Sequence, residues 1–416
     1  MLQLLACRRP VAHRPAARRY SSSQEARVGF QRCGGTSDNP PMASSVPAAS
    51  SGYDRLSELK AFDATKAGVK GLVDAGITTI PRIFHDPAAA AAQPKPSSTN
   101  HRGLVTGSSS RVPVIDLAAG TRADLVTQVK SAAETVGFFQ VINHGVPDNL
   151  LSEMLGSIRS FHEQPAEAKA PYYNRDREPV RRVRYQSNFD LYTSPAANWR
   201  DTLFMVMTPS PEEVPPPCRR VLPEYTDRVR RLGAILLGIL SEAMGLHPGF
   251  LQHDAGCLDD GLSVAGHYYP PCPEPHLTMS TTRHSDPSFL SVLLQDEVGG
   301  LQVLVNDEDG RGSSSWVDVP PVPGALVVNM GDFLQLVSND RFKSVEHRVL
   351  ATAAGPRVSV GCFFRTTDGS KVYGPIVNSL QDERPRYRST TVPEFVGYYM
   401  DKGLDGRSKL EHFRLS

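Results

Sequence analysis

The chain has 416 residues, enough for two or three domains or for one large domain with helical additions, and 40% of them are hydrophobic. Its formal net charge of +1 gives no electrostatic reason to expect nucleic acid or an anionic membrane as a partner. The longest apolar run, residues 232–240, is too short to span a bilayer, which predicts a buried helix and no membrane segment.

The six cysteines show neither CxxC spacing nor the density of a disulfide scaffold. This usage predicts free thiols in a reducing compartment, and we expect a cytoplasmic protein.

Residues 1–24 form a leader without Asp or Glu that contains five arginines and ends in a run of serines. This composition is typical of an organelle transit peptide and predicts a plastid location if residues 1–41 are translated. The alternative is that Met42 is the working start and that residues 1–41 are an extension that is not translated. Both interpretations predict a disordered leader over residues 1–41.

Residues 42–110 are expected to hold one helix and a linker. Apolar residues recur at helical spacing between Ser57 and Val73, which predicts one amphipathic helix there. From residue 86 to residue 111 the sequence is rich in Pro, Ala, Ser and Gly, which indicates a linker.

Residues 111–261 are predicted to form an α/β region. Strands are expected at residues 113–117 and 137–143, and helices at residues 121–133, 150–161 and 225–244. His144 follows the second strand at a turn with Gly145 and Pro147, which favours a structural role over a metal ligand. An arginine-rich stretch, residues 176–201, carries Phe189 and Tyr192. These two aromatic side chains are candidates for a substrate pocket, and the alternative is that they pack helices onto the sheet.

From residue 262 to residue 367 the sequence changes to short β-rich runs separated by Gly, Pro, Asn and Asp. Many short strands with turn signals predict a sandwich or barrel, and a double-stranded β-helix, the jelly roll of cupin type, is the simplest solution. Residues 368–416 are expected to form a helical tail. The expected fold class is therefore mostly β with helical additions, with a jelly-roll core and an N-terminal helical layer.

A possible metal site lies in this β-rich region. His284 and Asp286 are two residues apart, and in an extended strand such residues point to the same face. His347 follows further along the chain. Two imidazoles and one carboxylate on one side of a metal ion form the facial triad of non-haem Fe(II) oxygenases.

Several segments resemble the plant 2-oxoglutarate- and Fe(II)-dependent dioxygenases, in the same order and spacing. The resemblance covers roughly residues 53–416 and is closest to the branch that holds the 1-aminocyclopropane-1-carboxylate oxidase homologues and the grass benzoxazinone-glucoside dioxygenase. The matching segments are VPVIDL (112–117), GFFQVINHGVP (137–147), YYPPCPEP (268–275), HSDPSFLSVLLQD (284–296), VNMGD (328–332), NDRFKSVEHRV (339–349) and RVSV (357–360).

The resemblance implies an enzyme that binds Fe(II) through the triad and uses 2-oxoglutarate and O2 as co-substrates, with ascorbate as reductant. Arg357 and Ser359, two residues apart on one strand, are then expected to bind the distal carboxylate of 2-oxoglutarate. Tyr269 is a third donor by resemblance to the Asn-x-Tyr motif of the family. This sequence departs from that motif with His267 in place of Asn, which leaves the hydrogen bonding and tautomer of His267 in doubt.

The first guess for the substrate is a benzoxazinoid glucoside, and Phe364 joins Phe189 and Tyr192 as a candidate pocket residue. The resemblance begins shortly after Met42, which favours Met42 as the start. We expect a monomer with a small-molecule substrate. Two alternatives remain: an ascorbate-dependent 1-aminocyclopropane-1-carboxylate oxidase that forms ethylene, and a non-catalytic jelly-roll protein that binds a metabolite.

Overall fold

The structure is a computed structural model of the whole chain. It describes residues 52–92, 111–176, 181–206, 210–258, 261–306, 313–366, 368–377, 384–404 and 408–415. The predicted disordered leader, residues 1–41, and most of the predicted linker lie outside these ranges. The description below concerns the compact unit that begins at Asp54.

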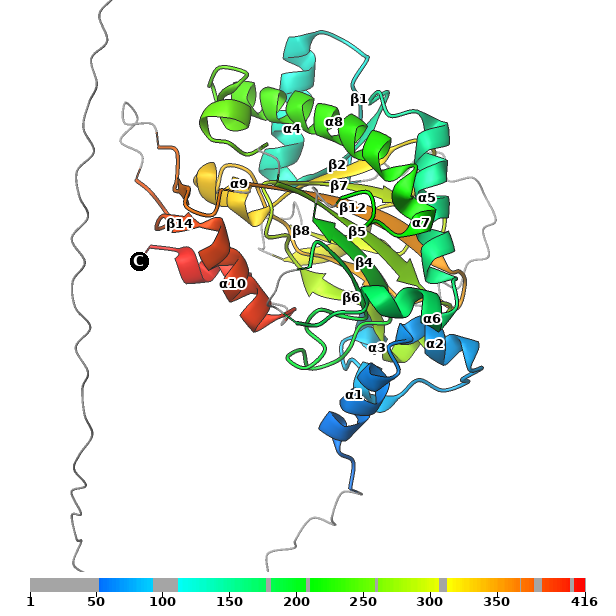
Figure 1. Cartoon of the computed structure of the whole chain (residues 1–416). Helices are drawn as coiled ribbons and strands as arrows, with labels where there is room; N and C mark the ends of the chain where they lie inside the picture. The colour runs from blue at the N-terminus through cyan, green and yellow to red at the C-terminus, as the bar shows by residue number, and fades with distance from the viewer. Residues whose placement is uncertain are drawn as a thin grey trace, which may run out of the picture. The chain divides into compact units, whose positions relative to one another are not determined.

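Two β-sheets form the centre of the molecule (Figure 1). The larger sheet has eight strands in the order β1-β2-β10-β7-β12-β5-β4-β3, and the smaller has four in the order β6-β11-β8-β9. Only the pairing of β1 with β2 is parallel among the described pairs of these two sheets. The bounds of the larger sheet are β1 (Val114–Asp116), β2 (Phe138–Ile142), β3 (Val183–Gln186), β4 (Asp201–Val206), β5 (Gly261–Tyr269), β7 (Leu290–Gln295), β10 (Leu326–Met330) and β12 (Arg357–Arg365).

The predicted double-stranded β-helix is confirmed by these two facing sheets. The smaller sheet consists of β6 (Met279–His284), β8 (Leu301–Asn306), β9 (Ser314–Asp318) and β11 (His347–Leu350). Side chains alternate between the faces of each strand, so strands such as β2 and β10 contribute to two different cores. Between the sheets lies a cluster that includes Phe138, Leu301 and Val349.

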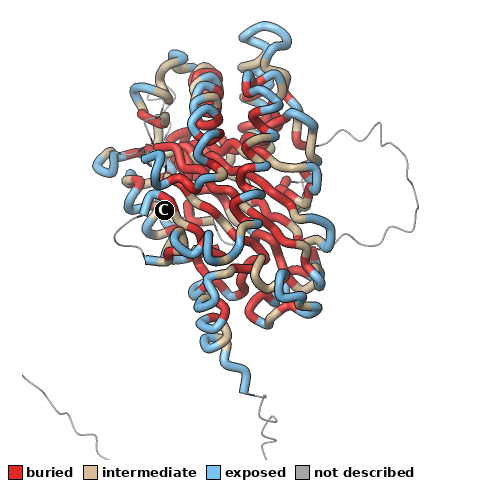
Figure 2. The backbone as a smooth tube through the Cα atoms, turned by 45° about the vertical axis from the view of Figure 1, so that its right-hand side comes forward, coloured by how far each residue is buried: buried red, intermediate tan, exposed pale blue. Residues whose placement is uncertain are grey.

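The outer face of the larger sheet is covered by three long helices, α4 (Arg122–Thr135), α5 (Asp148–His162) and α8 (Leu222–Ala243) (Figure 1). Each helix buries one apolar stripe in a large core shared with the sheet, and the opposite stripe is exposed (Figure 2). Helix α4 begins with a capping box, in which Thr121 and Asp124 satisfy each other's backbone amides. No helix in the described ranges is both long and apolar enough to cross a membrane.

The N-terminal part of this unit forms two helices rather than the single predicted one, α1 (Arg55–Ala64) and α2 (Gly68–Asp74). The chain reverses between them through Lys66 and Gly68, both with positive φ. The amides of Val69 and Lys70 donate to the buried Asp201 carboxylate at 2.8 Å each, which fixes the start of α2. Sequence periodicity could not show this break, because the partner lies far away in the sequence.

Short helical elements connect the larger ones. The alanine run within the predicted linker forms α3 (Ala89–Ala92), which packs on Met279. The other short elements are η1 (Arg82–Phe84), α6 (Ala166–Lys169), η2 (Ala170–Tyr172), α7 (Pro216–Arg219), η3 (Phe250–Asp254), η4 (Pro275–Leu277) and α9 (Asp332–Val337).

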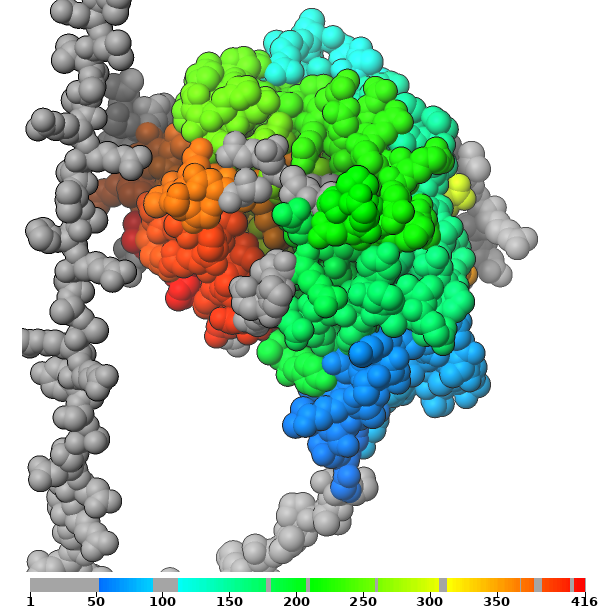
Figure 3. All heavy atoms as spheres, viewed as in Figure 1, coloured from blue at the N-terminus to red at the C-terminus, as the bar shows by residue number. Residues whose placement is uncertain are grey.

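The C-terminal segment consists of the β13–β14 hairpin, helix α10 (Val392–Lys402) and a last turn, η6 (Lys409–Phe413). Strands β13 (Val372–Tyr373) and β14 (Thr390–Thr391) pair antiparallel. Phe395 of α10 packs between Phe333 of α9 and Phe413, with ring centroids 4.8 and 4.7 Å apart. In the space-filling view this segment covers one side of the molecule, in orange and red (Figure 3).

Candidate active site

Three ligand-type side chains converge inside the β-helix. His284, at the end of β6, lies directly opposite His347, at the start of β11, in the register of the smaller sheet. Asp286 lies two residues after the end of β6. Its Oδ1 is 3.7 Å from Nε2 of His284 and 3.6 Å from Nε2 of His347. One ligand atom from each residue therefore lies within 4.8 Å of the others, a spacing that fits one shared metal ion.

Hydrogen bonds orient each of these side chains. Nδ1 of His284 is 2.8 Å from the carbonyl of Thr282, and Nδ1 of His347 is 3.2 Å from the carbonyl of Val345. An imidazole that donates through Nδ1 leaves its Nε2 lone pair free for a metal, and both Nε2 atoms face Asp286.

The carboxylate of Asp286 is oriented in the same manner. Its Oδ2 accepts from Ser291 Oγ at 2.7 Å and from Asn329 Nδ2 at 2.9 Å. These bonds turn Oδ1 toward the two imidazoles. All three free ligand atoms thus point to one place, which is the arrangement that a facial metal site requires.

The electrostatic environment favours metal-binding protonation states. Burial lowers the pKa of His284 strongly, and the adjacent His347 lowers it further, so the His284 ring is neutral. Burial would raise the pKa of Asp286, but the two neighbouring histidine rings and the bonds from Asn329 and Ser291 outweigh it and lower the pKa. Two neutral imidazoles and one carboxylate are the forms that bind a divalent cation.

A buried arginine side chain lies at the other end of the same cavity. Arg357 is 1% exposed, and its Nη1 donates to Ser359 Oγ at 3.1 Å while Nη2 donates to Gln295 Oε1 at 3.1 Å. The guanidinium carbon lies 4.8 Å from the centre of the Tyr269 ring, and Nε is buried without a described hydrogen-bond partner. The structure thus places Arg357, Ser359 and Tyr269 next to one another.

The guanidinium groups of Arg357 and Arg200 both lower the pKa of Tyr269. Burial would raise the pKa of Tyr269, but Arg357, Arg200 and the hydroxyl groups of Ser359 and Thr281 lower it below its usual value. Arg200 was not predicted as a site residue. It is 7% exposed, its Nη1 donates to Thr281 Oγ1 at 3.0 Å, and its Nε is another buried donor without a described partner. Sequence reasoning offered no signal that this arginine of the 176–201 stretch faces inward.

The histidines, Asp286 and the arginines line one cavity of about 60 Å³ between the two sheets. A buried, positively charged end suits an anion, because a buried charge is costly without a partner. The residues therefore fit both the metal and the dicarboxylate that the sequence implies: three converging ligand atoms at one end and an unsatisfied guanidinium donor at the other.

His267 lines this cavity but does not join the metal group. Its Nδ1 is 3.0 Å from Thr202 Oγ1. Burial and the charges of Arg200 and Arg357 hold the pKa of His267 well below its usual value, so its ring is neutral. His144 has the structural role that its turn indicated, since Nε2 contacts the Gly324 carbonyl at 2.8 Å and Nδ1 accepts from the Val146 amide.

The three residues proposed for a substrate pocket lie in different places. Phe189 stacks on Tyr399 of α10, with ring centroids 6.2 Å apart. Tyr192 is 43% exposed, and its hydroxyl donates to Asp63 at 2.9 Å, so it ties a loop to α1. Phe364 points out of the β-helix and packs against Gly233 of α8. The adjacent Phe363 lines the cavity instead, on the same strand face as Arg357 and Ser359.

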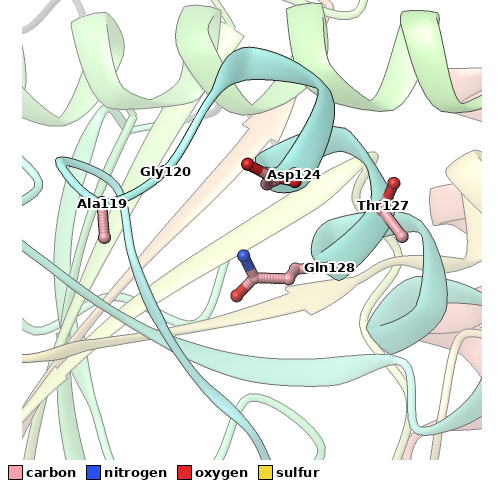
Figure 4. Close-up of a pocket in the computed structure, with 5 residues that line it drawn as sticks. All are labelled: Ala119, Gly120, Asp124, Thr127 and Gln128. Atoms are coloured by element: carbon pink, nitrogen blue, oxygen red, sulfur yellow. The ribbon is translucent and has the colours of Figure 1, made fainter.

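A second hollow lies on the surface at the start of α4 (Figure 4). Its one carboxylate, Asp124, already accepts from the amide and hydroxyl of Thr121. The hollow thus contains a helix cap, and its other polar side chains are those of Thr127 and Gln128. It is lined by Ala119, Gly120, Asp124, Thr127 and Gln128.

Comparison with known families gives two matches that together cover most of the described core. Residues 261–366 match the 2OG-Fe(II) oxygenase superfamily, and residues 112–224 match the N-terminal region of non-haem dioxygenases in morphine synthesis. The first match contains the whole triad together with Arg357 and Ser359.

Individual relatives cover almost the entire chain. The "1-aminocyclopropane-1-carboxylate oxidase homolog 1" of Arabidopsis thaliana is 50% identical over 385 residues, which is 90% of this chain and 100% of the relative. Among solved structures, JOX2 in complex with 2OG, Fe and JA has a TM-score of 0.69 at 27% identity, over 84% of this chain and 98% of that one. A rice dioxygenase for auxin oxidation has a TM-score of 0.58 at 26% identity, over 73% and 100% of the two chains.

Proposed function

Because this chain belongs to the 2OG-Fe(II) oxygenase superfamily, we propose that it hydroxylates a small plant specialised metabolite. It is a non-haem Fe(II) enzyme with 2-oxoglutarate and O2 as co-substrates, and ascorbate is the typical reductant. When bound, the metal and 2-oxoglutarate supply the oxidising chemistry: one oxygen atom enters the substrate, the other enters succinate, and CO2 is released. The metal ligands, Arg357 and Ser359 are all present, which argues against the alternative of a non-catalytic binding protein.

In this proposal His284, Asp286 and His347 hold the Fe(II), and the convergence of their ligand atoms is the observation that carries it. Arg357, Ser359 and Tyr269 hold the distal carboxylate of 2-oxoglutarate. Arg200 adds positive charge beside Thr281, at the same end of the cavity. The walls of the β-helix limit the access of water, which strengthens each of these charged interactions.

Replacing the carboxylate ligand tests the proposal. We expect Asp286→Ala to lose Fe(II) binding and 2-oxoglutarate-dependent succinate formation, because two imidazoles without the carboxylate leave the site incomplete. Circular dichroism should remain that of the wild type, since packing between the sheets does not depend on the metal. The matched control is Asp227→Ala on the exposed face of α8. Wild-type metal affinity in Asp286→Ala would exclude this residue as a ligand.

For the substrate we propose a benzoxazinoid glucoside, on the resemblance of the chain to the grass dioxygenase. Purified enzyme with Fe(II), 2-oxoglutarate and ascorbate should convert such a glucoside to a product heavier by one oxygen atom, measured by mass spectrometry. If the glucoside stimulates no succinate formation while another fraction of a plant metabolite extract does, the ring system is wrong but the dioxygenase function stands.

A second candidate is favoured by the names of the Arabidopsis relatives, which are homologues of 1-aminocyclopropane-1-carboxylate oxidase. The two candidates differ in one measurable product. Ethylene from the amino acid with ascorbate and without 2-oxoglutarate would support the oxidase. Substrate-dependent succinate supports the hydroxylase.

We further propose a monomer that works in the cytoplasm, without a nucleic-acid or membrane partner. The near-neutral charge and the free buried cysteines in the described ranges support this proposal. Size-exclusion chromatography with light scattering tests the monomer. A fluorescent fusion that carries residues 1–41 distinguishes the cytoplasm from the plastid.

A further inference from the structure

The inner face of the larger sheet extends beyond the cavity. The cavity reaches Gly361 and Phe363 of β12. Gly361 pairs with Ala265 of β5, Ala265 with Phe204 of β4, and Phe204 with Arg184 of β3. Arg184 and Phe204 therefore continue the row of Gly361 toward the edge of the sheet.

A second arginine follows Phe363 on β12. Arg365 is two residues further along and points to the same face, a step of roughly 7 Å. Phe363 pairs with Ser291, whose hydroxyl donates to Asp286. Arg365 thus lies one row beyond the level of Asp286, on the side away from Arg357.

Side chains on the inner face of these strands are less buried than those on the outer face. Arg184, Phe204, Phe363 and Arg365 are only half-buried, although they lie in the middle of the fold. Their neighbours on the same strands are fully buried beneath the helices: Val183, Tyr185, Leu203, Met205, Cys362 and Phe364. The difference indicates that these side chains of the inner face remain partly accessible to solvent.

Both arginines stack on aromatic rings. The guanidinium carbon of Arg184 lies 4.8 Å from the ring centre of Phe204, and that of Arg365 lies 6.0 Å from the ring centre of Phe363. Each Nε is buried and has no hydrogen-bond partner among the described residues. Nor does a carboxylate of these ranges form an ion pair with either side chain.

These charges are unfavourable as they stand. Burial lowers the pKa of both arginines. For Arg365, the nearby Tyr399 and Asp286 oppose this shift, and repulsion from Arg184 adds to it. A cation over a ring gains about 0.5–2 kcal/mol, while an unpaired buried charge costs several kcal/mol. Stacking therefore accounts for where the guanidiniums lie, but neither guanidinium has a carboxylate in direct contact among the described residues.

We propose that Arg184 and Arg365 bind the carboxylate of the primary substrate, while Phe204 and Phe363 pack against its apolar body. Guanidinium groups match the planar, two-oxygen geometry of a carboxylate. Arg200 and Arg357 lie at the other end of the cavity, where 2-oxoglutarate is held, so the two anions have separate sites. The inference rests on the proposed dioxygenase function and defines the substrate class as small apolar carboxylic acids. A substrate of this class would take the place of the benzoxazinoid glucoside proposed above, which has no carboxylate.

The test measures binding of 3-phenylpropanoate and its uncharged amide, 3-phenylpropanamide, by calorimetry without oxygen. The enzyme is loaded with Fe(II) and saturating 2-oxoglutarate. The acid should bind the wild type at least tenfold more tightly than the amide. Arg184→Gln and Arg365→Gln should each weaken the acid about tenfold or more and leave the amide unchanged, because a charge-assisted bond is lost. Arg228→Gln, on the exposed face of α8, is the matched control.

Three results would overturn the inference: equal binding of acid and amide, no binding of the acid, or wild-type affinity for the acid in both variants. The affinity for 2-oxoglutarate, measured in the same preparations, distinguishes a failure of the carboxylate site from a failure of the proposed dioxygenase function. If the wild type binds 2-oxoglutarate but not the acid selectively, only the carboxylate site fails. If the wild type with Fe(II) does not bind 2-oxoglutarate, the proposed function fails and the inference with it.

Discussion

Arg357 illustrates how one buried charge is prepared for a ligand. Its two terminal nitrogens are held by Ser359 and Gln295, while Nε and the face opposite Tyr269 have no counter-charge in the described chain. The protein thus fixes the guanidinium geometry in advance but leaves its charge to be neutralised by the co-substrate. Such pre-organisation reduces the entropy lost when the ligand binds.

We expect Arg357→Ala to raise the Michaelis constant for 2-oxoglutarate by about ten- to a hundredfold, because a charge-assisted hydrogen bond is worth roughly 1.5–3 kcal/mol. The measurement is succinate formation over a range of 2-oxoglutarate concentrations. Ser359→Ala should have a smaller effect, since it removes a neutral donor. An unchanged Michaelis constant in Arg357→Ala would remove Arg357 from this role.

His162 gives the stability a defined dependence on pH. The ring is fully buried, contacts the Gly266 carbonyl through Nε2 at 3.1 Å and stacks on Tyr268. Burial lowers its pKa from 6.5 to about 3. Below pH 6.5 the unfolded chain therefore binds a proton that the folded protein does not, and the free energy of unfolding falls as the pH falls toward 3.

From pH 6.5 to pH 5 this single group should lower the free energy of unfolding by about 2 kcal/mol. Denaturant titrations of the wild type and of His162→Gln, at pH 7 and at pH 5, measure the effect. The loss between the two pH values should be smaller in the variant by about that amount. Equal losses would show that His162 titrates normally in the folded protein.

At the scale of elements, β4 connects the N-terminal helices to the active site. Its first residue, Asp201, accepts from two amides at the start of α2 and from Ser187. The preceding Arg200 lines the cavity. The same short stretch of chain therefore holds a helix on one side and a catalytic-cavity residue on the other.

Replacing Asp201 by Ala should lower the free energy of unfolding by roughly 2–4 kcal/mol, because the amides of Val69 and Lys70 lose a shared buried acceptor. The effect is measured by urea titration, with Asp116→Ala as a control, since the bonds to the Asp116 carboxylate are exposed. A loss equal to that of the control would mean that α2 does not depend on this anchor.

The elements differ in how well sequence alone predicts them. Helices α4, α5 and α8 lie within a few residues of their predicted bounds, and β2 lies within the apolar run, residues 137–143, that predicted it. The helix predicted from Ser57 to Val73 was wrong in its middle, because a distant carboxylate and a positive-φ turn decide the break. Periodicity describes contacts along one face, and it contains no information about a partner more than a hundred residues away.

The site shows the same division. Spacing along one strand predicts that His284 lies beside Asp286 and that Arg357 lies beside Ser359. His347 and Tyr269 come from other strands, and they were anticipated from the resemblance to the dioxygenase family. The alternation that places Arg357 and Ser359 on one face also selects Phe363, and applying it further would have replaced Phe364. The same alternation also reaches Arg365. Arg200 and Arg184 could not be found in this way, because their positions depend on how β3 and β4 pair with the rest of the larger sheet.

For the molecule as a whole, the N-terminal helices are part of one folding unit with the sheets. Phe62 of α1, Phe84 and Trp199 form an aromatic column, with ring centroids 5.3 and 5.0 Å apart. Trp199 directly precedes Arg200, and its Nε1 donates to the Pro270 carbonyl at 3.1 Å. The packing of α1 thus supports the segment that carries Arg200 and the strand end that carries Tyr269.

Phe84→Ala should lower the free energy of unfolding by about 3–5 kcal/mol, because it opens a cavity in this column. Thermal unfolding, compared with Ile235→Ala on the exposed face of α8, measures the loss. A variant as stable as the control would show that the N-terminal helices contribute little to the stability of the unit.

The absence of one side chain determines how wide the enzyme's interior can be. Gly361 has no Cβ, and an added one would lie 3.0 Å from the Phe363 ring, which occupies that space. An alanine there would add a methyl group to the cavity wall and would require the Phe363 ring to shift by a few tenths of an ångström. Exchange of a single hydrogen for a methyl group therefore offers evolution, or an engineer, a simple means of changing which compounds are oxidised.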